Sequence, residues 1–108
     1  AGGRAARRQA LGAAGAGHGP AGSRVTAINA DQVETPIFER FVAARAAAAG
    51  RTVEAQLDIY RRRSLLGAGL IPPAAVADIA ALLCSARFRY TTGDILPIDG
   101  GLPEAIPR

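Results

Sequence analysis

Few side chains in this sequence have the chemistry that catalysis or metal binding needs. The single His18 lies in a glycine-rich stretch with no Cys, Asp or Glu beside it, so no metal site is expected there. The single Cys84 lies in an apolar helical run, which favours a small buried side chain in a reducing compartment. Tyr60 and Tyr90 are potential acid–base groups, but a phenol titrates near a pH of about 10 and needs a neighbouring cation to act at neutral pH. The chain contains no lysine to supply that cation.

Arginine supplies all 13 basic residues and gives a net charge of +4, with an isoelectric point of about 10.6. This balance raises the alternative of a non-catalytic basic interaction module that binds nucleic acid. The arginines are scattered, however, apart from the cluster Arg61–Arg63, and no aromatic residues alternate with them to form a stacking surface. We therefore expect a solvated helix face and no nucleic-acid partner. No apolar run is long enough to predict a membrane span.

The elements that must position these residues follow from local patterns. Residues 24–29 form a β-branched, mostly apolar run that is typical of a buried strand. Capping residues and apolar spacing predict three helices after it, which begin at Pro36, after Thr52 and at Pro72–Pro73. A second strand is expected in residues 91–99, where Pro97 indicates an edge position or a bulge.

Residues 1–22 are almost wholly Ala, Gly and Arg. Residues 5–11 are compatible with a helix, but the glycines from Gly12 onward disfavour its continuation, so a poorly ordered segment or a remnant helix is expected. Two strands joined by helices predict a parallel sheet, and a parallel sheet needs several strands with both faces covered. We therefore expect that strands are missing upstream. The absence of Met agrees with a chain that begins inside a longer reading frame.

Two motifs carry a resemblance to the short-chain dehydrogenase/reductase family. The first is RVTAINADQVETP, which resembles the family pattern R-V-N-x-(I/V)-x-P-G-x-(I/V)-x-T, with Asn29, Val33 and Thr35 on matching positions. The second is PPAAVADIAALLCSARFRYTTGDILPIDGG, in which Thr92–Gly93 match the family's T-G and Asp99–Gly101 match its D-G-G. The resemblance covers about residues 24–101, and its two motifs stand in the family's order.

This resemblance implies an α/β fold, namely the carboxy-terminal portion of a Rossmann-type doubly wound parallel sheet with two strands and about three helices, incomplete as a domain. Residues 23–108 would form that portion, with the family's substrate lid at about residues 36–70. The implied parent transfers a hydride between NAD or NADP and a small aldehyde, alcohol or ketone. It would be a cytoplasmic homo-oligomer.

The resemblance also assigns the site. Val33 would offer backbone groups to the nicotinamide carboxamide, beside Asn29, and the Thr35 hydroxyl would reach the carboxamide or the pyrophosphate. The other interpretation of Thr35 is a plain helix N-cap, and both roles can coexist. The family's catalytic Y-x-x-x-K pair cannot exist in a chain without lysine, and its Lys position falls at about Arg4, with the Tyr before Ala1. No catalytic residue is therefore expected, and the isolated chain is expected to be inactive.

The first motif departs from the family pattern at two positions. Ala30 and Asp31 stand where the family has Pro and Gly, and Asp31 adds a negative charge and a side chain at a tight turn. Within the lid, Arg61, Arg62 and Arg63 are candidates for holding an anionic group.

The segments YRRRSLL, IPP and GGLPEAIPR resemble the dehydrogenase domain of bifunctional rhamnulose-1-phosphate aldolase/short-chain dehydrogenase proteins of rhamnose catabolism. The alternatives are a single-domain alcohol or ketone dehydrogenase, the basic interaction module, and a remnant that does not fold independently.

Overall fold

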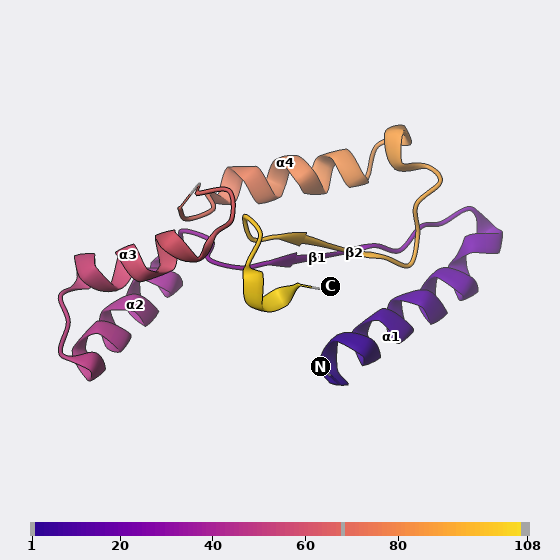
Figure 1. Ribbon diagram of the computed structural model, residues 1–108. Coiled ribbons are helices and arrows are strands. Elements are labelled where there is room, and N and C mark those ends of the chain that lie inside the picture. The colour runs from indigo at the N-terminus through magenta and orange to yellow at the C-terminus, as the bar shows by residue number, and fades with distance from the viewer. Residues whose placement is uncertain (1, 68, 107–108) are drawn as a thin grey trace. The chain divides into compact units, whose positions relative to one another are not determined.

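The computed structural model describes residues 2–67 and 69–106, with side chains from residue 6 onward in the first helix (Figure 1). These residues form four α-helices, α1 (Gly2–His18), α2 (Pro36–Ala49), α3 (Val53–Arg63) and α4 (Pro73–Leu83). Two strands, β1 (Ala27–Ala30) and β2 (Ile95–Ile98), pair in one sheet. Short 3₁₀ turns follow α1, α4 and β2 at Gly19–Ala21, Ala86–Phe88 and Pro103–Ala105. None of the described helices is long and apolar enough to cross a membrane.

The two strands run parallel, as the order of elements predicts. The Ala27 N–H donates to the Asp94 carbonyl at 3.0 Å, and the Asp31 N–H donates to the Ile98 carbonyl at 3.1 Å. From the first bond to the second, the donor and the acceptor both move towards the carboxyl end of their strands, so the two strands run in the same direction. The α/β fold with a two-stranded parallel sheet is therefore confirmed, and this amount of sheet is a partial Rossmann-type arrangement.

The chain divides into two compact units, and each is described by itself. The first unit contains residues 1–29 and 77–97. In Figure 1, α1 and the part of α4 in this unit lie on opposite sides of the strand pair. The segment before β1 joins the unit together, because the Val25 N–H donates to Thr92 Oγ1 at 3.0 Å and the Gly93 N–H donates to the Val25 carbonyl at 2.6 Å.

The prediction that no stable helix continues beyond residue 11 is wrong, because α1 runs on to His18. The reason is a close approach of two backbones within the first unit. A side chain added at Gly93 would lie 3.5 Å from the Gly12 Cα atom, and one added at the buried Gly15 would lie 3.2 Å from Thr92 Oγ1. The glycines lower helix propensity, but Gly15 and Gly93 let α1 lie directly against the Thr92–Gly93 turn.

Cys84 is exposed, so the expectation of a buried thiol is also wrong. At the end of α4 the buried residue is Leu83, which is 7% exposed. Successive side chains of a helix point in different directions, so the next residue, Cys84, does not share this buried position.

The second unit contains residues 30–76 and 98–108, of which Pro107 and Arg108, the end of the tail resemblance, lie outside the described part. Helices α2 and α3 form a hairpin in it (Figure 1), and both begin at the predicted N-caps Thr35 and Thr52. An aromatic cluster joins the two helices, since the Phe38 and Tyr60 rings meet edge to face with centroids 5.6 Å apart. The core of the hairpin is Val42, which is fully buried.

After α3 the chain pairs with the D-G-G turn in the second unit. The Leu65 N–H donates to the Gly101 carbonyl at 2.8 Å, and Ser64 Oγ donates to the Gly100 carbonyl at 2.9 Å. Gly100 and Gly101 have φ angles of 70° and 78°, and a side chain at Gly100 would collide with Ser64. Positive φ and close approach together explain why this turn needs glycine.

Two glycine substitutions in α1 test the close approach. Gly12→Ala should stabilise the chain by up to about 1 kcal/mol, because alanine favours the helix and the new methyl group meets no atom within 4 Å. Gly15→Ala should gain less or lose stability, because its methyl group must displace Thr92. Thermal unfolding followed by circular dichroism measures both. Equal gains for the two variants would show that α1 does not pack against the Thr92–Gly93 turn.

Candidate cofactor-binding site

The segment after β1 presents one backbone edge outward. Val33 forms a parallel bridge with Ile71, in which the Ile71 N–H donates to the Gln32 carbonyl at 2.9 Å and the Glu34 N–H donates to the Ile71 carbonyl at 2.8 Å. Peptide units are planar and trans, so the groups on the other side of these two units, the Val33 N–H and the Val33 carbonyl, point away from Ile71. Val33 therefore offers a donor and an acceptor side by side, as the resemblance implies.

Thr35 lies at the N-terminus of α2, two residues after Val33. Its Oγ1 accepts a hydrogen bond from the Phe38 N–H at 3.2 Å, so the N-cap interpretation is confirmed. A hydroxyl that accepts one hydrogen bond retains a hydrogen to donate. Because α2 is 14 residues long, its N-terminal N–H groups and dipole also favour a negatively charged ligand group.

The departure at Asp31 is accommodated by its neighbour. The Asp31 carboxylate accepts from the Gln32 N–H at 2.7 Å, and the left-handed backbone conformation falls on Gln32, with a φ of 56°. Among the described residues, Gln32 is the one non-glycine residue with a positive φ. Asp31 therefore needs no glycine-like conformation, although its exposed charge remains close in sequence to Val33.

Gln32 is a site residue that the sequence interpretation missed. Its side chain is 2% exposed and bonded at both ends of the amide, to the Tyr60 carbonyl at 3.1 Å and to Arg63 Nη1 at 3.2 Å. No local pattern marks this residue, since a glutamine after a strand is usually exposed. Its partners lie in α3, about 30 residues later, and only the fold brings them together.

Each of the arginines Arg61, Arg62 and Arg63 has a carboxylate partner. Arg61 donates to Glu54 at 2.7 Å and to Asp58 at 3.3 Å, and Arg62 lies 3.6 Å from Asp58. The hydrogen bond to Glu54, followed by the one to Asp58, raises the pKa of Arg61. The third arginine, Arg63, bonds Glu104 through Nη2 and through Nε at 3.0 Å. An anionic ligand at this cluster would therefore have to compete with protein carboxylates.

Arg62 is the least engaged of the cluster. Its side chain is 82% exposed and it contacts Asp58 alone, whereas the side chains of Arg61 and Arg63 are 41% and 35% exposed. Exposed ion pairs of this kind contribute little to stability and exchange partners readily. The cluster does not present three unpaired guanidinium groups to a ligand.

Asn29 lies in β1 within the first unit, and it is exposed. The side chain of Arg4, at the family's Lys position, lies outside the described side chains. Among the described residues, His, Cys, Asp and Glu form no group of three or more that would hold a metal ion. The Tyr60 ring packs on Phe38, and the Tyr90 side chain is exposed beside Arg89.

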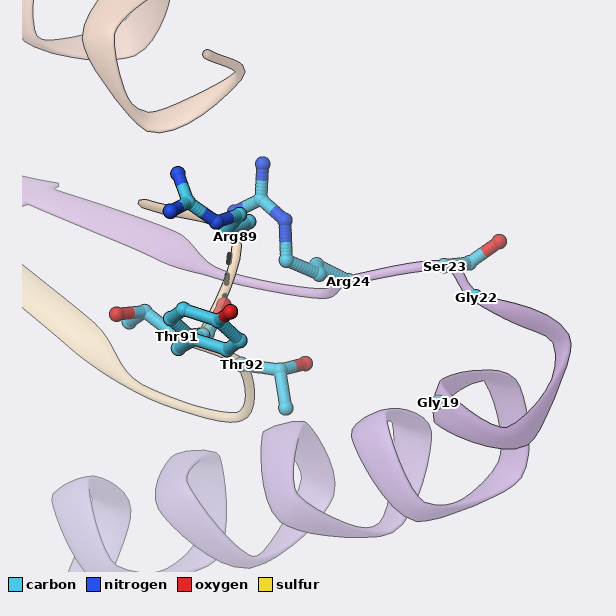
Figure 2. A pocket seen from close by; sticks show the side chains of 8 residues that line it. Gly19, Gly22, Ser23, Arg24, Arg89, Thr91 and Thr92 are labelled. Carbon is cyan, nitrogen blue, oxygen red and sulfur yellow. Dashed lines mark hydrogen bonds between the residues drawn. The ribbon is translucent and has the colours of Figure 1, made fainter. Parts of the chain in front are cut away.

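A shallow hollow of about 220 Å³ lies elsewhere, in the first unit (Figure 2). Its lining contains none of the predicted site residues and consists of Gly19, Gly22, Ser23, Arg24, Arg89, Tyr90, Thr91 and Thr92. Arg24 donates from its two Nη atoms to the carbonyls of Thr91 at 3.5 Å and Ser85 at 3.3 Å, the first bond being drawn in Figure 2. These bonds hold the loop after α4 to the segment before β1, so this arginine has a structural role.

A family profile and several solved structures match this chain. The profile of the family described as enoyl-(acyl carrier protein) reductase matches residues 4–103. A search of curated protein sequences found no match. Among solved structures, a short-chain dehydrogenase family protein from Francisella tularensis superposes with a TM-score of 0.83 at 20% identity, over 93% of this chain and 41% of the other.

Two further structures are similar. L-sorbose reductase from Gluconobacter frateurii, complexed with NADPH and L-sorbose, gives a TM-score of 0.78 at 20% identity over 94% of this chain and 39% of the other. A short-chain glucose/ribitol dehydrogenase from Brucella melitensis gives 0.71 at 23% identity over 90% of this chain and 34% of the other. The chain thus spans 34% to 41% of the length of these three proteins.

A parallel strand pair in a chain that alternates strands and helices is a partial Rossmann-type α/β arrangement. The match over residues 4–103 makes the family specific. The chain belongs to the short-chain dehydrogenase/reductase family.

The pair Arg63–Glu104 predicts a pH dependence. The hydrogen bond from Arg63 holds the pKa of Glu104 below its ordinary value of 4.5. A carboxyl with a lowered folded-state pKa stabilises the fold above its ordinary pKa, and this contribution is lost as the pH falls through the lowered value. Thermal midpoints of the chain and of Glu104→Gln should therefore differ at neutral pH and converge below pH 4.5. A difference that persists unchanged in acid would contradict this assignment, and high salt should reduce it because the pair is exposed.

Proposed function

We propose that this chain contributes the carboxamide side of a nicotinamide dinucleotide site in an NAD(P)-dependent oxidoreductase. The observation that carries the proposal is the outward-facing N–H and carbonyl of Val33. A primary carboxamide has one acceptor oxygen and a donor NH₂ group, so it complements this pair as a neighbouring strand would. When bound, the nicotinamide ring supplies or accepts the hydride.

We assign the individual residues the roles that the family resemblance implies. Val33 binds the carboxamide through its backbone, and Thr35 donates its remaining hydroxyl hydrogen to the carboxamide or the pyrophosphate while it caps α2. Asn29 is the third residue that the family motif assigns to the cofactor. Asp31 and Glu34 are exposed carboxylates in the same segment, so they disfavour a close pyrophosphate and place the favourable contacts at the nicotinamide end.

The substrate of the whole protein is a small aldehyde, alcohol or ketone. NADPH and L-sorbose are the ligands of the sorbose reductase to which this fold is similar, and a polyol-type substrate fits the same class. The segments YRRRSLL, IPP and GGLPEAIPR support the narrower proposal of an aldolase/dehydrogenase fusion of sugar catabolism. The lid arginines, of which Arg62 is the most exposed, would then face an anionic substrate group.

Nicotinamide mononucleotide tests the binding proposal, with nicotinic acid mononucleotide as the matched ligand. The first has a carboxamide, whereas the carboxylate of the second cannot donate to the Val33 carbonyl. We expect nicotinamide mononucleotide to shift the amide resonances of Val33, Glu34 and Thr35 and to bind about fivefold to tenfold more tightly than the acid, as one hydrogen bond implies. Equal binding of both ligands, or shifts elsewhere alone, would refute the assignment.

The two threonine caps provide a matched pair of variants. Thr35→Val and Thr52→Val each remove a hydroxyl that caps a helix, at 3.2 Å in α2 and 3.1 Å in α3, so each should destabilise the chain by about 1 kcal/mol. Thr35→Val alone should weaken nicotinamide mononucleotide, and Thr35→Ser should restore its binding. A similar loss in both variants would indicate that the ligand responds to stability and not to the Thr35 hydroxyl.

Catalysis by this chain alone is not expected. It has no lysine, so it cannot contain the catalytic Y-x-x-x-K pair that the family resemblance implies. Incubation with NADP and alcohols should produce no reduced nicotinamide, as measured by its near-ultraviolet absorbance. Turnover by the purified chain would contradict this prediction.

A further inference from the structure

Gln32 has an unusual combination of burial and backbone conformation. A φ of 56° is left-handed, and residues with a side chain adopt it at an energetic cost unless their surroundings hold them there. Gln32 is also 2% exposed, which is rare for a glutamine. Both features require specific contacts, and the second unit supplies them.

The contacts of Gln32 engage its backbone and its side chain. The backbone N–H donates to Asp31 and the backbone carbonyl accepts from Ile71. The side-chain Nε2 donates to the Tyr60 carbonyl at 3.1 Å, and Oε1 accepts from Arg63 at 3.2 Å. The side chain thus lies in a closed set of polar contacts.

The Tyr60 carbonyl belongs to the last turn of α3, whose carbonyls have no partner within the helix. Gln32 satisfies this carbonyl and so caps the carboxyl end of α3 from a distant part of the sequence. Arg63, in the same turn, lies over the Tyr60 ring at 5.8 Å and bonds Glu104. The end of α3 is therefore held by two segments that are distant in sequence, through Gln32 and through Glu104.

The same residue determines which way Val33 faces. The peptide unit between Gln32 and Val33 is planar, so the direction of the Gln32 carbonyl fixes the opposite direction of the Val33 N–H. The Gln32 carbonyl is aimed at Ile71 while its side chain is anchored on α3. A shift of the last turn of α3 would pull on the residue that sets this peptide plane.

We propose that Gln32 is a positioning residue that couples the carboxyl end of α3, the second lid helix, to the ligand-facing backbone of Val33. The inference rests on the proposed function for the identity of the ligand, but the coupling itself exists without a ligand. A ligand carboxamide bound at Val33 changes the environment of the Tyr60–Arg63 turn through the Gln32 side chain. Displacement of Arg63 toward a substrate anion reorients Val33 by the same path.

The test compares Gln32→Gly with Gln56→Ala. Glycine accepts the left-handed conformation, so Gln32→Gly removes the side-chain contacts without adding backbone strain. Gln56 is the matched control, because it is also a buried glutamine of this unit, 6% exposed, and accepts from an arginine, Arg51, at 3.1 Å. It has no described bond to Gln32 or to Val33.

The first measurement needs no ligand. In Gln32→Gly the amide hydrogens of Glu34 and Ile71 should exchange about tenfold faster relative to those in the middle of α2. Gln56→Ala should leave this ratio unchanged, even where it lowers overall stability. An unchanged ratio in Gln32→Gly would overturn the proposal.

The second measurement uses nicotinamide mononucleotide. In the unaltered chain, saturation should shift the amides of Arg61–Ser64 as well as Val33. In Gln32→Gly the ligand should bind about fivefold more weakly and the Arg61–Ser64 shifts should vanish, whereas Gln56→Ala should keep both. Shifts at Arg61–Ser64 that persist in Gln32→Gly would overturn the proposal.

Failure of the unaltered chain to bind would count against the proposed function, and the exchange measurement would still decide the role of Gln32. If Gln32→Gly does not fold, Gln32→Glu replaces it. The carboxylate accepts from Arg63 but cannot donate to the Tyr60 carbonyl, so the same changes should appear in smaller measure. No change in Gln32→Glu would likewise overturn the proposal.

Discussion

The pairing of Val33 with Ile71 is the constraint on which the second unit depends. Val33 lies just beyond the end of β1, where the chain leaves the sheet for the helical hairpin. Ile71 lies after the hairpin, where the chain continues towards α4. Two hydrogen bonds fix two successive peptide planes. One backbone edge is thereby occupied and the other is left facing outward, so the geometry that closes the hairpin also creates the edge that a ligand can pair with.

Interactions of the carboxyl end of α3 reinforce this closure. The Gln32 side chain caps it, the D-G-G turn pairs with the residues that follow it, and Glu104 bonds Arg63. The first of these contacts satisfies the Tyr60 carbonyl, one of the backbone carbonyls at the end of α3. Helix α3 is thus anchored at its carboxyl end, which Gln32 links to the backbone next to Val33.

Much of the fold was predictable because it depends on local chemistry. Thr35 and Thr52 accept hydrogen bonds from N–H groups three residues ahead, and proline at the first helical position needs no partner. The positions of Val33 and Thr35 likewise came from a short motif. Gln32 could not be found in this way, because its partners Tyr60 and Arg63 are distant in sequence and a glutamine has no intrinsic preference for a left-handed, buried position.

The sequence by itself determined the starts of α2, α3 and α4 and the absence of lysine, because each depends on residue type and near neighbours. The order of strands and helices along the chain predicted the parallel pairing. Tertiary structure alone decided three other features. Gly12 and Gly15 belong to a helix because its backbone lies against Thr92 and Gly93. Cys84 is exposed because Leu83 holds the buried position. The N–H and carbonyl of Val33 face outward because Ile71, which lies 38 residues later in the sequence, pairs with the other edge of the backbone.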